Sequence, residues 1–173
     1  MRCELVALAL VLAGCPSPRE RESLVDHSLW SELEAGEDPF DDRPDTVTCP
    51  TSGWGLEVDP TPGLEVDTGA CDYLSAAQPT LVDVRAGETI RIQISHGALV
   101  FGGPAEAHAA LQIDGALLLD ERVTIPADAD SLEVLSQADA SIAAGARVVV
   151  HLHNHGDNAW LISEVSTGPP APE

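Results

Sequence analysis

The chain has 173 residues, of which 29 are acidic and only eight are basic, and its formal net charge is −21 at pH 7. A surface with this charge repels the phosphate backbone of nucleic acids, so nucleic-acid binding is excluded. Acidic side chains can attract divalent cations, although they also serve simply to keep a protein soluble.

The first fourteen residues have the composition of an export signal. Arg2 precedes an apolar run from Leu5 to Leu12, and small residues follow that run. This order is typical of a secretory signal peptide, which is removed from the mature protein. The run is shorter than the roughly twenty apolar residues that a transmembrane helix needs. We therefore expect residues 1–14 to be a signal and not a membrane span.

The segment Leu12-Ala13-Gly14-Cys15 resembles the lipobox of bacterial lipoproteins. The resemblance implies that Cys15 is acylated and becomes the mature N-terminus, so that the membrane is a partner through this lipid. Pro16 follows the cysteine, whereas an Asp there commonly retains a lipoprotein at the inner membrane. The expected location is therefore the cell envelope, anchored to the outer membrane.

Two of the four cysteines remain after export and acylation. Cys3 is removed with the signal and Cys15 carries the lipid, which leaves Cys49 and Cys71. In an oxidising compartment these two are expected to form one disulfide. Such a bridge, closing a loop of about twenty residues, contributes on the order of 3 kcal/mol. A paired metal site or two free thiols are the alternative interpretations.

Residues 15–48 are predicted to form an acidic tether, because ten acidic residues lie between Glu20 and Asp45. Apolar residues within it recur at roughly helical spacing, which favours a short amphipathic helix. Trp30 and Phe40 are large for a free linker and are candidates for docking on the following domain. The residues with helical spacing are Leu24, Val25, Leu29, Trp30 and Leu33.

Residues 49–167 carry the patterns of β-strands. Ile90, Ile92 and Ile94 alternate with polar residues, as in a half-buried strand. Asp114-Gly115 is a strong signal for a type I′ hairpin. These patterns predict an all-β domain, an antiparallel β-sandwich or jelly roll of about eight strands. Residues 168–173 are expected to be a disordered tail.

Three histidines recur at alternate positions near the end of this domain. If the strand is regular, His151, His153 and His155 point to one face, opposite the apolar residues between them. Neutral imidazoles arranged in this way can bind zinc or copper when an acidic or third histidine ligand completes the site. Asp157 is the acidic candidate closest in the sequence, and two further histidines are available, at His96 and His108.

A solvated sheet face beside a tight turn is the alternative interpretation of the histidine row. Asn154, Gly156 and Asn158 tolerate the backbone conformations of such a turn. Trp160 follows across the hairpin and could stack on a histidine without any metal. Under this interpretation the protein needs no cofactor.

Two metal-binding families resemble parts of this region. The spacing of Gly145, His151, His153 and Asp157 resembles the first half of the cupin motif, which implies a metal site inside a jelly roll. Asp157 stands where cupins have a glutamate, and Glu164 stands where they have a glycine. Cupredoxins are exported β-sandwiches with histidine ligands, but a blue-copper site needs a cysteine thiolate and usually a methionine. The cysteines expected here leave none free, so a histidine-only site remains.

No catalytic motif accompanies these features, since the nucleophile-elbow, zinc-protease, phosphate-loop and dinucleotide patterns are all absent from the sequence. We therefore expect a lipid-anchored envelope protein whose non-catalytic β-sandwich binds a small ligand or another envelope protein. The alternative hypothesis is an envelope protein that binds zinc or copper. Its predicted ligands are His151, His153, His155 and Asp157.

Overall fold

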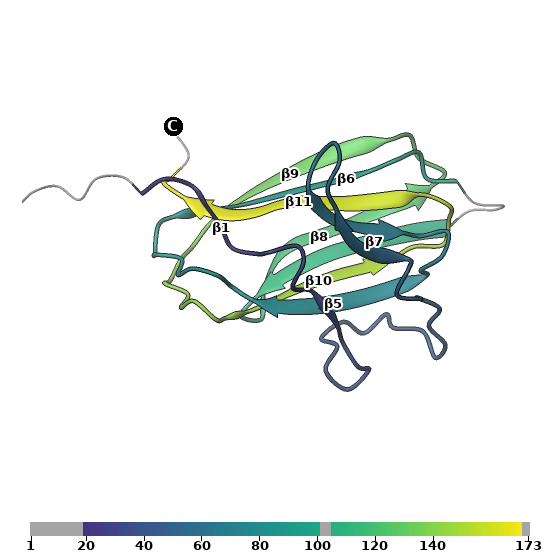
Figure 1. Cartoon of the computed structure of the whole chain (residues 1–173), viewed down its shortest axis with the longest axis horizontal. Helices are drawn as coiled ribbons and strands as arrows, with labels where there is room; N and C mark the ends of the chain where they lie inside the picture. The colour runs from purple at the N-terminus through teal and green to yellow at the C-terminus, as the bar shows by residue number, and fades with distance from the viewer. Residues whose placement is uncertain (1–18, 101–104, 171–173) are drawn as a thin grey trace, which may run out of the picture.

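The computed structural model describes residues 19–100 and 105–170, and in these residues two antiparallel β-sheets pack face to face (Figure 1). The all-β sandwich predicted from the sequence is therefore confirmed. Among the described residues, no helix is long and apolar enough to cross a membrane. The predicted signal peptide and Cys15 lie outside the described residues.

In the described ranges, eleven strands make up the two sheets. The first sheet has the order β3 (Trp54–Glu57), β4 (Gly63–Asp67), β11 (Ala159–Gly168), β6 (Thr89–His96) and β9 (Asp130–Gln137), and β1 (Glu22–Ser23) also pairs with β11. The second has the order β2 (Ser31–Glu32), β5 (Tyr73–Pro79), β10 (Arg147–His153), β7 (Ala105–Ile113) and β8 (Ala116–Ile125).

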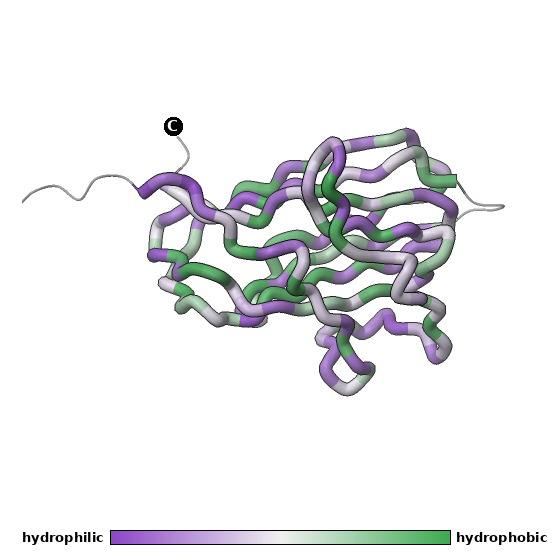
Figure 2. The backbone as a smooth tube through the Cα atoms, viewed as in Figure 1, coloured by the Kyte–Doolittle hydropathy of each residue, from purple (hydrophilic) through white to green (hydrophobic). Residues whose placement is uncertain are grey.

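The core lies between the inner faces of the sheets and is built from alternate residues of each strand. Ile90, Ile92 and Ile94 of β6 face the core from one sheet, and Val148 and Val150 of β10 face it from the other. Hydrophobic and hydrophilic positions alternate along β6, whereas β10 has three successive valines at 148–150 and alternates only after them; Figure 2 colours the backbone by this hydropathy. Because successive side chains of a strand point to opposite faces, the polar residues between them face outward.

The connection between β7 and β8 is the two-residue turn predicted from Asp114-Gly115. Both residues have positive φ, 52° at Asp114 and 79° at Gly115. A type I′ turn requires this conformation at both positions, and its twist matches that of the flanking strands. The hairpin therefore forms where the sequence predicted it.

Residues 19–48 pack against the sandwich, which differs from the tether and the short helix expected for this segment. The chain is extended there, and its strands β1 and β2 pair with β11 and β5. Leu24 is fully buried, and Val25, Trp30 and Leu33 are also buried. The sheet edges supply hydrogen-bond partners to an extended backbone, so these apolar side chains can enter the core without a helix.

Two further expectations concern the ends of the predicted domain. Cys49 and Cys71 form the predicted disulfide, which joins positions 22 residues apart in the sequence. Gly168 is the last residue of β11 and pairs with Thr89, so the chain is still in the sheet where the tail was expected to begin. Residues 171–173 of that tail lie outside the described part of the chain.

Candidate metal centre

Strand β10 lies between β5 and β7 and presents its histidines on the outer face of the five-stranded sheet. Val150 and Leu152 belong to the core, so His151 and His153 point the other way. Cupin ligands face the barrel interior, which is the opposite arrangement. The register of β7 places His108 directly beside His153. Three imidazole rings are thereby gathered on one face.

A segment of the chain crosses this outer face and covers the histidines. We call residues 34–48 the strap. Directly before the strap, the amide of Leu33 donates a hydrogen bond to the carbonyl of Ser75 at 2.8 Å. The ring of Phe40 stacks on His151, with 4.4 Å between ring centroids. His151 is only 3% exposed as a result, and His108 is 6% exposed. The face is therefore covered, whereas one interpretation of the sequence had it solvated.

Asp42 of the strap is the residue on which the histidines converge. Its Oδ2 atom lies 2.7 Å from Nδ1 of His108 and 3.3 Å from Nε2 of His151. Nδ1 of His153 lies 3.5 Å from the same oxygen. The ligand atoms of Asp42, His108 and His151 all lie within 4.8 Å of one another. This cluster, Asp42 with His108 and His151, is the candidate site.

The orientation of His151 follows from a chain of hydrogen bonds behind it. Ser75 Oγ donates to Oδ1 of Asp38 at 3.0 Å, because a carboxylate can only accept. The same hydroxyl lies 3.2 Å from Nδ1 of His151 and must accept there. Nδ1 of His151 therefore carries the proton in the neutral ring. Its Nε2 atom then presents a lone pair towards Asp42.

Asp38 anchors this chain of hydrogen bonds. Besides Ser75, it accepts from the hydroxyl of Tyr73 at 2.8 Å and from the guanidinium of Arg43 at 3.0 Å. Burial raises the pKa of Asp38, but these hydrogen bonds and one from the Phe40 amide outweigh burial and lower it. Asp38 is thus ionised at neutral pH, which fixes the direction of the Ser75 bond.

His108 is held by carboxylates on both sides of its ring. Nδ1 faces Asp42, and Nε2 lies 2.8 Å from Oδ1 of Asp120 on β8. In metal sites, a ligating histidine commonly donates its other N–H to a carboxylate, which fixes the tautomer and orientation of the ring. The Asp120 contact can play this part. In the structure Nδ1 of His108 makes a hydrogen bond with Asp42, so a metal bound at this atom would take the place of the proton in that bond.

The electrostatics of the cluster keep Asp42 and His151 in the forms that bind metals. Burial lowers the pKa of His151 to about 4 against the opposing effect of Asp42, so the ring is neutral at pH 7. Burial raises the pKa of Asp42, but the bond from His108 and the attraction of both histidines lower it to about 2. Burial and His155 lower the pKa of His153. A neutral imidazole and an ionised carboxylate are the metal-binding forms.

The spacing of these atoms suits a small divalent ion. Ligands about 2.0–2.1 Å from zinc in a tetrahedral site are roughly 3.3 Å from one another. The contact between Asp42 and His151, at 3.3 Å, has that value, whereas the contact between Asp42 and His108, at 2.7 Å, has the length of a hydrogen bond and would have to widen around an ion. Oδ1 of Asp42 and Nε2 of His153 are also buried without a hydrogen-bond partner among the described residues. Three protein ligands leave a fourth position for His153 or for water.

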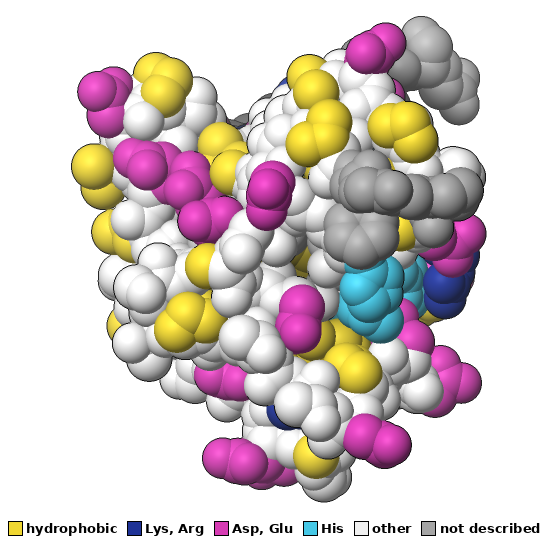
Figure 3. Space-filling model, turned by 90° about the vertical axis from the view of Figure 1, so that its right-hand side faces the viewer, with side chains coloured by type: hydrophobic (Ala, Val, Ile, Leu, Met, Phe, Trp, Pro, Cys, Tyr) yellow, Lys and Arg dark blue, Asp and Glu magenta, His cyan; other side chains and the backbone are white. Residues whose placement is uncertain are grey.

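The other residues predicted from the sequence lie around this cluster or away from it. His155 is exposed and contacts the ring of His153, with 4.6 Å between centroids. Asp157 lies in the turn after β10, where its backbone bridges to Val100. The turn reverses the chain before Asp157, so its carboxylate does not join the cluster. Figure 3 views this end of the sandwich and shows histidine side chains at the surface.

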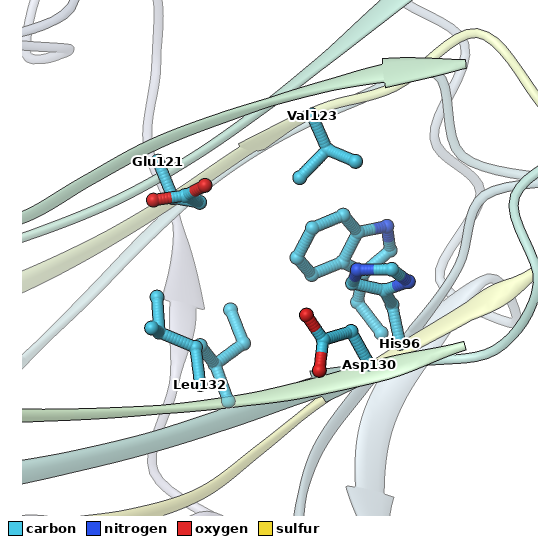
Figure 4. Close-up of a pocket in the computed structure, with 7 residues that line it drawn as sticks. His96, Glu121, Val123, Asp130 and Leu132 are labelled. Carbon is cyan, nitrogen blue, oxygen red and sulfur yellow. The ribbon is translucent and has the colours of Figure 1, made fainter. Parts of the chain in front are cut away.

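A small pocket with a largely apolar lining lies between the two sheets, where His96 and Trp160 meet (Figure 4). Their ring centroids are 4.4 Å apart, so Trp160 contacts His96 and not the histidine row. Trp160 faces inward from β11, whereas the row faces outward from β10. Glu121 and Asp130 line the same cavity, which has a volume of about 50 Å³. This volume holds a few water molecules.

Asp42 is the site residue that the sequence did not identify. It is one of ten acidic residues in a segment that the composition assigned to a tether. It lies 66 residues from His108 and 109 residues from His151 along the chain. No spacing rule connects positions so far apart. The large apolar residues of the segment, Trp30 and Phe40, were the signal that it docks.

Comparison with known proteins gives the fold a precedent. No protein-family model and no curated protein matches the sequence. Among solved structures, the carbohydrate-binding module TmCBM27, described for specific mannan recognition, aligns with a TM-score of 0.51 and 8% identity, over 89% of this chain and 98% of its own. The K1 cleaved adhesin domain of Lys-gingipain from Porphyromonas gingivalis aligns with a TM-score of 0.47 and 14% identity, over 88% and 98% of the two chains.

At these levels of identity the likeness establishes the architecture and nothing finer. This chain is a two-sheet β-sandwich whose fold is similar to that of TmCBM27. Two proteins that share a β-sandwich fold need not bind the same ligand, because unrelated functions occur on the same fold. The ligand has to be argued from the side chains of the site.

Proposed function

We propose that this protein is a lipid-anchored protein of the bacterial cell envelope whose non-catalytic β-sandwich binds one zinc or copper ion. The ligands are Asp42, His108 and His151, with His153 beside them. The lipobox at Cys15 supports the anchor and the outer-membrane location. The proposal keeps the metal hypothesis of the sequence but replaces two of its ligands, His155 and Asp157, by Asp42 and His108.

One observation carries the metal assignment. The lone pair on Nε2 of His151 faces the ionised Oδ2 atom of Asp42 at 3.3 Å. Two electron-rich atoms at this distance in a covered site repel each other unless a proton or a metal cation lies between them, and burial disfavours the protonated ring at pH 7. A divalent ion bound by Asp42 and His151 removes this repulsion. The Ser75 and Asp120 contacts behind the rings supply the supporting hydrogen bonds that metal-binding histidines have.

A carbohydrate is the ligand suggested by the description of TmCBM27. Ligand pockets for small organic molecules are lined largely by apolar and aromatic side chains. The large hydrophobic side chains exposed in the described part of the chain are all aliphatic: Leu29, Leu56, Val58, Leu81, Val100, Leu117 and Leu135. No specific observation on this surface therefore favours a sugar over a metal ion.

The test is a metal titration of the mature chain purified in detergent. Residues 19–48 must be kept, because they contain Asp42 and part of the core. We expect one zinc or copper ion per chain, and we expect His108→Ala with His151→Ala to abolish binding. His155→Ala is the matched control, because it removes an exposed histidine next to the cluster and should leave binding unchanged.

Two outcomes would contradict the proposal. The first is that the unmodified chain binds no metal above background, which would make the site a purely structural hydrogen-bond network. The second is that His155→Ala abolishes binding while the double variant, still folded by circular dichroism, retains it. That result would show that the metal binds at the exposed end of the histidine row, at His155, and not in the cluster.

A further inference from the structure

The distance between the lipid and the folded domain is much shorter than the sequence suggested. Arg19 is already docked on the sandwich, since its Nη1 atom donates to the carbonyl oxygen of Asp83 at 3.0 Å. The strand β1 then pairs with the end of β11, where Glu22 lies opposite Thr167. Only three residues, 16–18, separate Cys15 from this docked segment. Four residue steps span at most about 14 Å.

The docked segment enters the sandwich at one particular end. In Figure 1 the chain enters at the left, and the C-terminus leaves at the same end. The loop after β5, the β7–β8 turn and the loop before β10 also lie there, as two hydrogen bonds show. The amide of Thr80 donates to the carbonyl of Ala146 at 2.7 Å, and the amide of Asp114 donates to that of Arg147 at 2.9 Å. We call this the anchored end, comprising residues 19–23, 79–89, 113–117, 137–147 and 168–170.

The charge of the anchored end differs from that of the rest of the domain. It contains four of the seven described arginines, together with six acidic residues. The remaining described residues carry three arginines and 21 acidic residues. Arg19, Arg21 and Arg85 are paired with carboxylates, so the difference lies in repulsion: the anchored end has a net charge of −2 and the remaining described residues have −18. The four arginines are Arg19, Arg21, Arg85 and Arg147.

Exposed aliphatic side chains also project from this end. Leu81 follows β5 and is 46% exposed, and Leu117 follows the β7–β8 turn and is 49% exposed. Both belong to segments that surround the entry of the chain. A nearly neutral end with arginines and exposed leucines suits a lipid surface, whereas the strongly acidic remainder is repelled by it.

We infer that the sandwich stands end-on at the membrane, with the anchored end against the lipid head groups and the histidine cluster facing away from them. The inference rests on the acylation of Cys15 proposed above. The short link holds the anchored end near the membrane, and the acidic remainder turns away from it. Since β11 has ten residues, the two ends lie roughly 33 Å apart. His153, at the last position of β10, is therefore near the end that faces the surrounding compartment.

The test compares two positions at opposite ends of the mature lipoprotein bound to vesicles. Leu117→Cys places a thiol at the anchored end, and Val100→Cys places one at the opposite end, where the native side chain is 52% exposed against 49% for Leu117. Cys49 and Cys71 are oxidised, so each variant has one free thiol for a donor dye. The vesicles contain phosphatidylethanolamine, phosphatidylglycerol and a lipid with an acceptor dye on its head group.

Flotation of the vesicles is measured first and energy transfer second. We expect the protein to float with the vesicles and transfer from position 117 to be at least twice as efficient as from position 100. Failure to float overturns the lipid anchor and the orientation together. Flotation with equal transfer from both positions, or with stronger transfer from position 100, overturns the end-on orientation and leaves the anchor standing.

Discussion

The Nε2 atom of His151 lies 3.3 Å from Oδ2 of Asp42, so a ring buried on the central strand of one sheet faces a carboxylate from the strap. The two residues are 109 positions apart in the sequence. Their contact joins the strap to the sheet at the place where the histidines converge. It therefore links the chemistry of the site to the stability of the segment that covers it.

The chelator-treated protein should lose stability as the pH falls from about 6.5 to 4. Burial lowers the pKa of His151 to about 4 from its ordinary value of 6.5. Between these values the unfolded chain binds a proton that the native chain does not, so the free energy of unfolding decreases with falling pH. The expected loss is at most about 3 kcal/mol. Denaturant unfolding at pH 7.5 and pH 4.5 measures it.

His151→Gln should make this pH dependence shallower, whereas His155→Gln should leave it unchanged because His155 is exposed. The contribution of Asp42, whose pKa is lowered to about 2, is lost only at lower pH and does not overlap this range. An identical dependence in the native chain and the His151→Gln variant would show that the buried ring is not its origin.

Asp120→Ala should weaken zinc or copper binding by 10- to 100-fold without abolishing it. Asp120 does not belong to the ligand cluster but lies 2.8 Å from Nε2 of His108, so it orients a ligand. Glu121→Ala is the control, because the neighbouring carboxylate lies on the opposite face of β8 and lines the cavity between the sheets. Competitive titration with a chelator gives both affinities. Equal losses of metal affinity in the Asp120→Ala and Glu121→Ala variants would indicate that affinity depends on overall negative charge and not on the contact with His108.

Trp30→Ala should destabilise the protein by about 3–5 kcal/mol, because it leaves a cavity in the core. The side chain is 7% exposed and packs in the main hydrophobic cluster. Leu29→Ala removes a neighbouring side chain that is 51% exposed and should change the free energy of unfolding by less than about 0.5 kcal/mol. Unfolding in denaturant separates the two. No effect of either substitution would restore the interpretation of this segment as a free tether.

Replacing both Cys49 and Cys71 by serine should lower the free energy of unfolding by about 3 kcal/mol. The bridge closes a loop across 22 positions, and its loss increases the freedom of the unfolded chain. A reductant added to the native protein should produce a comparable loss. An unchanged unfolding midpoint in the double variant would show that the surrounding strands fix this region without the bridge.

The sequence predicted those parts of the fold that depend on local patterns. The alternation in β6 and β10 and the turn at Asp114-Gly115 each need only a few neighbouring residues. The strand β5 was not predicted individually, because Tyr73–Pro79 contains small and polar residues without a clear apolar alternation. Its outward residues Tyr73 and Ser75 are nevertheless the ones that support the site.

The candidate site could be predicted only in part, for a physical reason. His151 and His153 share a face because of the strand period, and that period is readable in the sequence. Asp42 reaches them only because the strap folds back over the sheet. A contact of this kind depends on tertiary packing, and composition assigned the same segment to a solvated tether.

Under the proposed export, the disulfide that follows the strap would set the order in which this protein matures. Thr48 and Asp72 exchange hydrogen bonds beside the Cys49–Cys71 bridge, so the strap is fastened where the two cysteines meet. Disulfides of this kind form in oxidising compartments and not in the reducing cytoplasm. If the protein is exported as proposed, the strap lacks this bridge before export, and the carboxylate of Asp42 is not yet held over the histidines. The proposed metal ion would then bind only after export.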